Sequence, residues 1–182
     1  MPGIRLNANA VSFTGALLCG VAGLLAATGK PLALVGCVFG LGVAFDHLDG
    51  RVARMEGAST RRMNGGLVDS LADHFGESAL FVGLILRNHE PDMLRLLAIG
   101  AILGLLTSYI KAVAFEHRLG ISWPEVKVFG RGIRATLLGV TLITAGVTSE
   151  SQILFWGLFV LVAFNAFTCV WRAVRSMLAA RP

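Results

Sequence analysis

Four aspartates stand within segments that are otherwise almost as apolar as a membrane span, and this feature constrains the fold most strongly. Asp46, Asp49, Asp69 and Asp73 occur in the stretch DHLDGRVARMEGASTRRMNGGLVDSLAD, residues 46–73. A lone carboxylate in such a segment costs several kcal/mol, and intramembrane carboxylates are rare and usually functional. A cluster of four therefore indicates a functional site rather than a structural accident.

The spacing of the four aspartates predicts a metal site. Asp46 and Asp49 are three residues apart and Asp69 and Asp73 are four apart, so each pair shares one face of a helix. Oxygen ligands in a like-charged cluster suit a hard divalent cation such as Mg²⁺ or Mn²⁺. With about 1.5 Å of rise per residue, both pairs lie at similar distances from the connecting segment Met55–Asn64, and we expect them to meet at similar depth.

The composition excludes an ordinary soluble domain. The chain has 182 residues, of which 55% are hydrophobic, and its mean hydropathy is +0.72. These values predict one polytopic, all-α membrane domain over residues 1–182. Six apolar stretches approach the length of about 20 residues that crosses a bilayer. They are Ala10–Thr28, Leu32–Met55, Gly65–Leu86, Met93–Phe115, Ile133–Val147 and Gln152–Val174.

The basic residues predict the orientation of these six spans. With the N-terminus inside, the outer side keeps only Lys30, Arg87 and Arg95, whereas most other arginines fall on the inner side. The positive-inside rule then predicts that both termini are cytosolic. The net charge of +5 is explained by this asymmetry, so we expect no nucleic-acid partner.

The motif resembles that of a known family. The patterns D-x-x-D-G-x-x-A-R and G-x-x-x-D-x-x-x-D are similar to the signature of the CDP-alcohol phosphotransferases. The matching residues are Asp46, Asp49, Gly50, Ala53, Arg54, Gly65, Asp69 and Asp73. One departure is the segment between Arg54 and Gly65, which has ten residues, Met55–Asn64, and is longer than expected in that family.

The resemblance implies a reaction of phospholipid biosynthesis. A phosphatidyl group passes from a CDP-alcohol such as CDP-diacylglycerol to the hydroxyl of a polar acceptor, and CMP is released. Two divalent ions, Mg²⁺ or Mn²⁺, would be held by the four aspartates, and Asp73 would be the catalytic base. By the same resemblance Gly50, Ala53, Arg54 and Gly65 would bind the CDP-alcohol. The expected enzyme is a homodimer in the cytoplasmic membrane of a prokaryote, with the active site facing the cytosol.

Shorter matches suggest which acceptor is used. Three short segments resemble the phosphatidylinositol phosphate synthase branch of the family. They are Ser108–Ala112, Arg131–Arg134 (RGIR) and Trp171-Arg172. The resemblance implies that Lys111, Arg131, Arg134 and Arg172 hold a phosphate on the acceptor, with inositol 1-phosphate as the leading candidate. An anionic phosphate gains charge-assisted hydrogen bonds from such a cluster, whereas a neutral polyol gains little.

Several alternatives stay open from the sequence alone. Another CDP-alcohol transferase, such as a phosphatidylglycerophosphate synthase-like enzyme, would share the same aspartates. A divalent-cation transporter would also place acidic residues in spans. A purely structural interpretation is a buried ion-pair cluster that only holds two helices together, in which Arg51 or Arg54 neutralises the aspartates. Glu77 continues the face of Asp69 and Asp73, and either joins their network or pairs with a basic group on a neighbouring helix.

Overall fold

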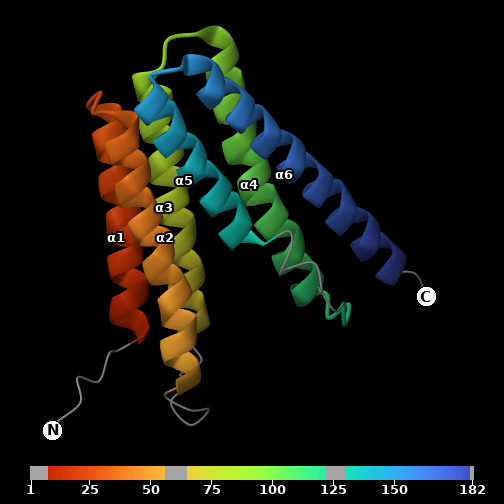
Figure 1. Ribbon diagram of the computed structural model, residues 1–182. Coiled ribbons are helices and arrows are strands. Elements are labelled where there is room, and N and C mark those ends of the chain that lie inside the picture. Colours follow the sequence, from red (N-terminus) through yellow and green to blue (C-terminus); the bar gives the residue numbers. More distant parts are fainter. Residues whose placement is uncertain (1–7, 56–64, 122–129, 181–182) are drawn as a thin grey trace, which may run out of the picture.

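Six α-helices make up the part of the chain that the computed structural model describes, residues 8–55, 65–121 and 130–180 (Figure 1). They are α1 (Ala8–Ala27), α2 (Leu32–Met55), α3 (Gly65–Arg87), α4 (Pro91–Glu116), α5 (Arg131–Thr148) and α6 (Ser151–Ala179). The predicted all-α fold is confirmed, and each helix coincides with one predicted stretch. The largest difference is at the end of α6, which continues beyond Val174 to Ala179.

The turns between helices follow from glycine and proline. Gly29, after α1, has a φ of 72°, a left-handed conformation that glycine adopts without a steric penalty. Pro91 is the first residue of α4, where a missing N–H group breaks no helical hydrogen bond. Arg87 donates from Nη1 to the carbonyl oxygen of Lys30, so the turns after α1 and α3 lie at the same end of the bundle.

Helices α1, α2 and α3 pack through glycines that bring their backbones together. A Cβ atom on Gly83 of α3 would overlap the carbonyl oxygen of Gly23 on α1. Between α1 and α2, a Cβ on Gly42 of α2 would lie 2.8 Å from the carbonyl oxygen of Gly15. Small residues permit this close approach between apolar helices. The α1 helix therefore lies against both helices that carry the aspartates.

Two glycines of α2, Gly36 and Gly40, have different surroundings. Gly36 packs closely, because a Cβ there would be 2.7 Å from Cγ1 of Ile143 on α5. Gly40 does not, because nothing lies within 4 Å of its Cβ position. It instead lines an open groove of about 460 Å³ between α2 and α5, together with His47 and Thr136.

The second half of the bundle is arranged around α5. In Figure 1, α4 and α6 lean away from α1, α2 and α3, and α5 lies between the two groups. The α5 helix packs on α2 and on α6, while α4 packs on α6. An apolar core fills the half of the bundle near the short turns, with Phe39, Phe81, Leu97, Leu142 and Leu158 almost completely buried. The polar residues described below lie nearer the other half.

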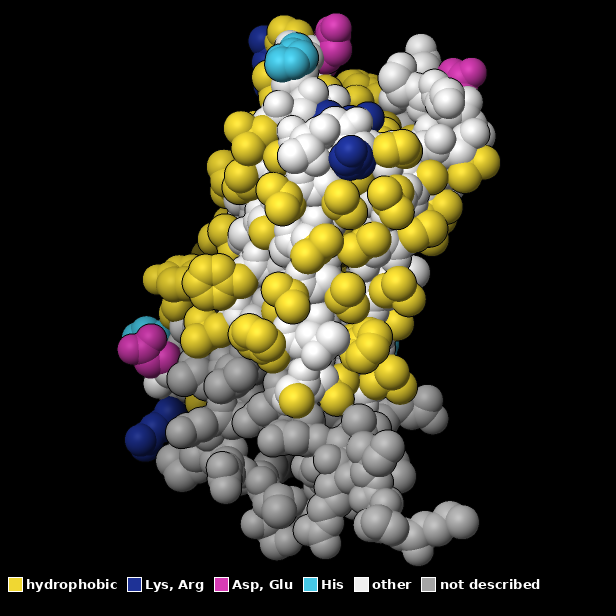
Figure 2. Space-filling view, turned by 90° about the vertical axis from the view of Figure 1, so that its left-hand side faces the viewer, with side chains coloured by type: hydrophobic (Ala, Val, Ile, Leu, Met, Phe, Trp, Pro, Cys, Tyr) yellow, Lys and Arg dark blue, Asp and Glu magenta, His cyan; other side chains and the backbone are white. Residues whose placement is uncertain are grey.

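The outer surface is apolar. Figure 2 shows a broad band of hydrophobic side chains, with charged side chains mainly at its edges. Large exposed apolar residues include Phe13, Phe115 and Trp156. Three helices of the described part are long and apolar enough to cross a membrane, through Ala10–Ala27, Pro91–Glu116 and Ser151–Ala179, and α2 has a shorter apolar segment, Leu32–Leu48. This surface is typical of an integral membrane protein.

Candidate active site

Arg131 lies at the centre of the candidate site, where the first turn of α5 meets α2 and α3. Its Nη1 atom is 3.1 Å from Oδ1 of Asp46 on α2 and also forms an ion pair with Oδ1 of Asp73 on α3. Between 17% and 22% of each of these side chains is exposed. Carboxylates from two helices thus converge on one cationic nitrogen in a partly buried setting, where charges are screened less than on the surface.

Glu77 extends this cluster by one turn of α3. Its Oε2 atom lies 3.9 Å from Nε of Arg131 and 3.7 Å from Nη2 of Arg134. Glu77 is only 9% exposed, and a carboxylate at this depth needs cationic partners to offset its desolvation. Glu77 thus fills both roles that the sequence left open, because it joins the aspartates through Arg131 and pairs with two basic groups of α5.

Thr107 connects the cluster to α4 and α6. Nη1 of Arg134 donates a hydrogen bond of 2.6 Å to the hydroxyl oxygen of Thr107. Nη1 of Arg172, on α6, donates one of 2.7 Å to the carbonyl oxygen of the same threonine. Arg134 is 1% exposed, Arg172 is 4% exposed and Thr107 is completely buried. Two arginines of different helices therefore converge on one residue of α4.

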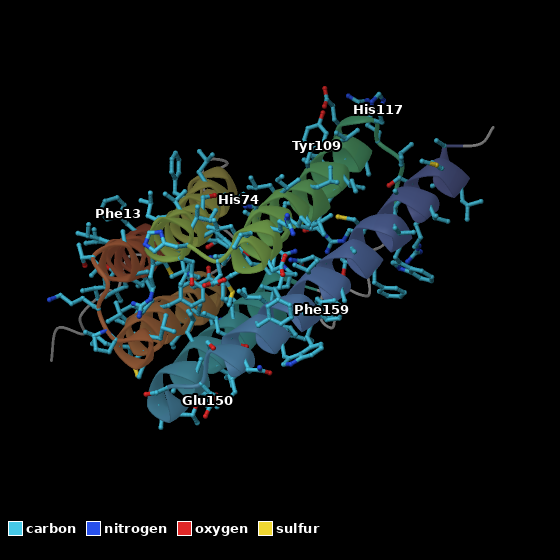
Figure 3. The ribbon with its side chains drawn as sticks, turned by 90° about the horizontal axis from the view of Figure 1, so that it is seen from above. Phe13, His74, Tyr109, His117, Glu150 and Phe159 are labelled. Carbon is cyan, nitrogen blue, oxygen red and sulfur yellow. The ribbon has the colours of Figure 1, made fainter. Side chains whose placement is uncertain are left out.

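A continuous polar network follows from these contacts. It begins at the aspartates of α2 and α3, passes through the arginines of α5 and the carboxylate of Glu77, and ends at Thr107 of α4 and Arg172 of α6. In Figure 3 nitrogen and oxygen atoms gather between the helices, whereas Phe13 and Tyr109 lie on the outside. Five of the six helices contribute to a single locus, as an active site in a helical bundle requires.

The structure brings together three of the four basic residues predicted to hold the acceptor. Arg131, Arg134 and Arg172 belong to the network, but Lys111 is exposed on α4. In the described part of the chain, no hydrogen bond or ion pair joins Lys111 to the network. It stands four residues after Thr107, hence on the same face of α4 and one turn closer to the end of that helix.

Several predicted residues cannot be compared at the level of side chains. The helical backbone of α2 and α3 includes them, but their side chains lie outside the described residues. They are Asp49, Gly50, Ala53, Arg54, Gly65 and Asp69. Among the side chains that are described, no group of three or more histidines, cysteines, aspartates or glutamates is placed to hold a metal ion.

The described carboxylates nevertheless fit a divalent cation. Oδ1 of Asp46 and Oδ1 of Asp73 contact the same positively charged atom, Nη1 of Arg131. Two carboxylate oxygens from different helices thus converge on one position that already accommodates positive charge. Hard oxygen donors of this kind are the preferred ligands of Mg²⁺ and Mn²⁺. Asp46 and Asp73 are the described residues that would hold such an ion.

Thr107 is the functional candidate that sequence reasoning missed. A signal for it was present, because Gly100, Gly104, Thr107 and Lys111 follow one another at spacings of four, three and four residues. These positions share one face of a helix. On this face of α4, Thr107 lies between two glycines and a lysine. It therefore marks the point along the helix where the apolar contacts give way to polar ones.

The fold and the site together define a class: an all-α integral membrane protein with an ionic site between its helices. Residues 5–174 match the CDP-alcohol phosphatidyltransferase family, and the chain belongs to this family. The resemblance based on the aspartate motif is thereby confirmed.

Curated relatives include the phosphatidylinositol phosphate synthases of Mycobacterium bovis and Mycobacterium tuberculosis. Each is 32% identical to this chain in an alignment of 148 residues that covers 75% of the chain. The chain spans 63% of the length of these relatives.

Solved structures of the Mycobacterium tuberculosis phosphatidylinositol phosphate synthase have the same fold. The apo form has a TM-score of 0.79 and 26% sequence identity, and the match covers 97% of this chain and 94% of that one. The form with CDP-DAG bound has a TM-score of 0.76, with 97% and 91% covered at the same identity. The complex with manganese and citrate has a TM-score of 0.78, with 97% and 87% covered.

Proposed function

We propose that this protein is a membrane-embedded phosphatidyltransferase. It transfers a phosphatidyl group from CDP-diacylglycerol to the hydroxyl of a polar acceptor and releases CMP. The observation that carries the proposal is the convergence of Asp46 and Asp73 from two helices on one cationic atom. Membership of the family supports it, as does the related structure with CDP-DAG bound.

In this proposal the four aspartates of the motif hold two divalent ions. Asp46, Asp49, Asp69 and Asp73 are the ligands, and the manganese complex of the related synthase supports a divalent metal. When bound, the ions neutralise the diphosphate of the donor and stabilise negative charge on the departing CMP. The CDP-alcohol lies against Gly50, Ala53, Arg54 and Gly65, where small residues leave room for the nucleotide.

Asp73 is the catalytic base of this proposal. It accepts the proton of the acceptor hydroxyl, whose oxygen forms a new bond to the phosphorus of the phosphatidyl group. The bond from that phosphorus to the oxygen of CMP breaks, and CMP leaves with the electron pair. Asp73 is partly exposed, so that a hydroxyl can approach its carboxylate.

The acceptor carries a phosphate, and inositol 1-phosphate is the leading candidate. Arg131, Arg134 and Arg172 belong to one network with the aspartates, and Lys111 lies one turn from Thr107 at the exposed end of the same face. The arginines would attract the phosphate, while the acceptor hydroxyl faces Asp73. The name of the related synthases gives phosphatidylinositol phosphate as their product, which supports this candidate; glycerol 3-phosphate is the alternative acceptor to compare.

The finer topology belongs to the same proposal. All six helices cross the cytoplasmic membrane of a prokaryote, both termini face the cytosol, and the active site opens to the cytosolic side. The lengths of the helices, from 18 to 29 residues, and the apolar belt support this arrangement. Reporter fusions at Lys30, Asn88 and Glu150 should all give an external signal, and an internal signal at any of them contradicts six spans. The homodimer that the family resemblance implies is tested by cross-linking in membranes.

The proposed reaction is tested with the purified protein in detergent. CDP-diacylglycerol and Mn²⁺ are supplied with inositol 1-phosphate or glycerol 3-phosphate, and the released CMP is measured. We expect CMP release that needs both an acceptor and the metal and that stops when a chelator is added. Absence of CMP release with every acceptor, or full release in the chelator, contradicts the proposed function.

A further inference from the structure

Thr107 of α4 is the residue at which α4, α5 and α6 meet through hydrogen bonds. It is completely buried on α4, yet it contacts the guanidinium groups of Arg134 on α5 and Arg172 on α6. Neither sequence motif nor family signature includes it. Its two oxygen atoms, one on the side chain and one on the main chain, each accept a hydrogen bond from a different arginine.

The hydroxyl of Thr107 is fixed in orientation. It donates a hydrogen bond of 2.8 Å to the carbonyl oxygen of Gly104, three residues earlier in α4. Its proton is therefore engaged within the helix, as is common for helical threonines. The lone pairs of the oxygen are directed away from that bond, and one of them accepts from Nη1 of Arg134. The threonine can only be an acceptor toward the arginine.

The contacts at Thr107 orient positive charge without cancelling it. Both of its oxygens are neutral, so the hydrogen bonds hold the guanidinium groups and leave their charge intact. Glu77 is 3.7 Å from Nη2 of Arg134, beyond hydrogen-bond distance, and it also pairs with Arg131. Nε and Nη2 of Arg134 are buried without a hydrogen-bond partner among the described residues. Such donors point to an anionic ligand that would complete the site.

We propose that Thr107 is a positioning residue of the acceptor site. Its hydroxyl fixes Arg134 and its carbonyl fixes Arg172, so that the two guanidinium groups are oriented for the acceptor's phosphate before it binds. This inference rests on the proposed function and deepens it. Because Arg134 and Arg172 are already held by one residue, the acceptor need not order these two long side chains when it binds. The smaller loss of side-chain entropy makes binding of the acceptor tighter.

The test compares three variants at Thr107 with a matched control. Thr107→Val keeps the shape of the side chain and removes the hydroxyl, Thr107→Ala removes it together with the methyl group, and Thr107→Ser retains it. The control is Thr168→Val on α6, because Thr168 is also buried and its hydroxyl bonds only within its own helix, to Phe164. The KM values for inositol 1-phosphate and CDP-diacylglycerol are measured, and calorimetry gives the affinity for inositol 1-phosphate without turnover.

We expect Thr107→Val and Thr107→Ala to raise the KM and the Kd for inositol 1-phosphate about tenfold or more, the effect of a lost hydrogen bond to a charged group. The KM for CDP-diacylglycerol should change less than about twofold, and Thr107→Ser and Thr168→Val should resemble the wild type. A Kd unchanged in Thr107→Val, equal losses for both substrates, or an equal effect of Thr168→Val overturns the inference. A wild type that binds inositol 1-phosphate but releases no CMP contradicts the proposed reaction and leaves the role of Thr107 to be decided by the binding data.

Discussion

The two halves of the bundle pack in opposite ways. Helices α1 and α3 meet backbone to backbone at Gly23 and Gly83, an apolar contact without charged partners. Helices α4, α5 and α6 meet instead at Thr107, through hydrogen bonds donated by buried arginines. Burying arginines is costly, and Nε and Nη2 of Arg134 have no hydrogen-bond partner among the described residues, which favours the proposed role in ligand binding.

The glycine contact between α1 and α3 supports the fold, whereas the arginine contacts of α5 belong to the candidate site. The α1–α3 contact holds the helix that carries Asp73 against its neighbour and needs only small residues. The contacts of α5 bring Arg131 to Asp46 and Asp73. Mutations in the first region should therefore change stability, whereas mutations in the second should change binding and catalysis.

The largest effect is expected at the proposed catalytic base. Asp73→Asn removes the group that we propose as proton acceptor and as a metal ligand, so kcat for CMP release should fall by about 10²- to 10⁴-fold. The matched control is Asp92→Asn, because Asp92 also pairs with an arginine, Arg95, but both side chains are more than 70% exposed. Such surface pairs contribute little, and the control should keep full activity. A kcat in Asp73→Asn within tenfold of the wild type would exclude this residue as the base.

The next effect is on stability and belongs to the glycine contact. Gly83→Ala places a Cβ against the carbonyl of Gly23, so α1 and α3 must separate, at a cost of about 1–3 kcal/mol. Gly20→Ala is the control on the same helix pair, since nothing lies within 4 Å of its Cβ position. We expect thermal unfolding in detergent at a lower temperature for Gly83→Ala and no loss for Gly20→Ala. Equal unfolding temperatures would mean that the helices are not held by this close approach.

The smallest effect concerns the metal. Arg131 pairs with Asp46 and Asp73, so in the proposed metal site it would compete with the cation for these two carboxylates. Arg131→Gln should therefore bind Mn²⁺ several-fold more tightly, an effect readable from the free Mn²⁺ signal in electron paramagnetic resonance. Arg95→Gln, which removes an exposed arginine, should leave Mn²⁺ affinity unchanged. Weaker Mn²⁺ binding in Arg131→Gln would mean that Arg131 supports the metal ligands instead of competing with the metal.

The sequence predicted the helices and part of the site for a physical reason. Apolar runs of bilayer length specify helices almost by themselves, and Asp46 and Asp73 interrupt those runs visibly. What the sequence did not reveal was which partner each charge meets, because this depends on how α4, α5 and α6 lean against the first three helices. Glu77 thus had two open roles, and the spacing that places Thr107 on one helix face with Gly104 and Lys111 does not show that two arginines meet it. Lys111 was expected with the arginines because of the resemblance of Ser108–Ala112 to the family, but a short sequence match does not establish contact, and Lys111 is exposed.

We propose that the charged half of the bundle binds an acceptor that carries its own phosphate. The most direct measurement supplies the purified protein with CDP-diacylglycerol, Mn²⁺ and equal concentrations of inositol 1-phosphate and inositol, and identifies the lipid products by mass spectrometry. The account predicts that nearly all of the product retains the acceptor's phosphate, because the arginine contacts favour the anion by about tenfold or more. If free inositol is incorporated as readily as inositol 1-phosphate, the arginines do not form the acceptor site and the account is wrong.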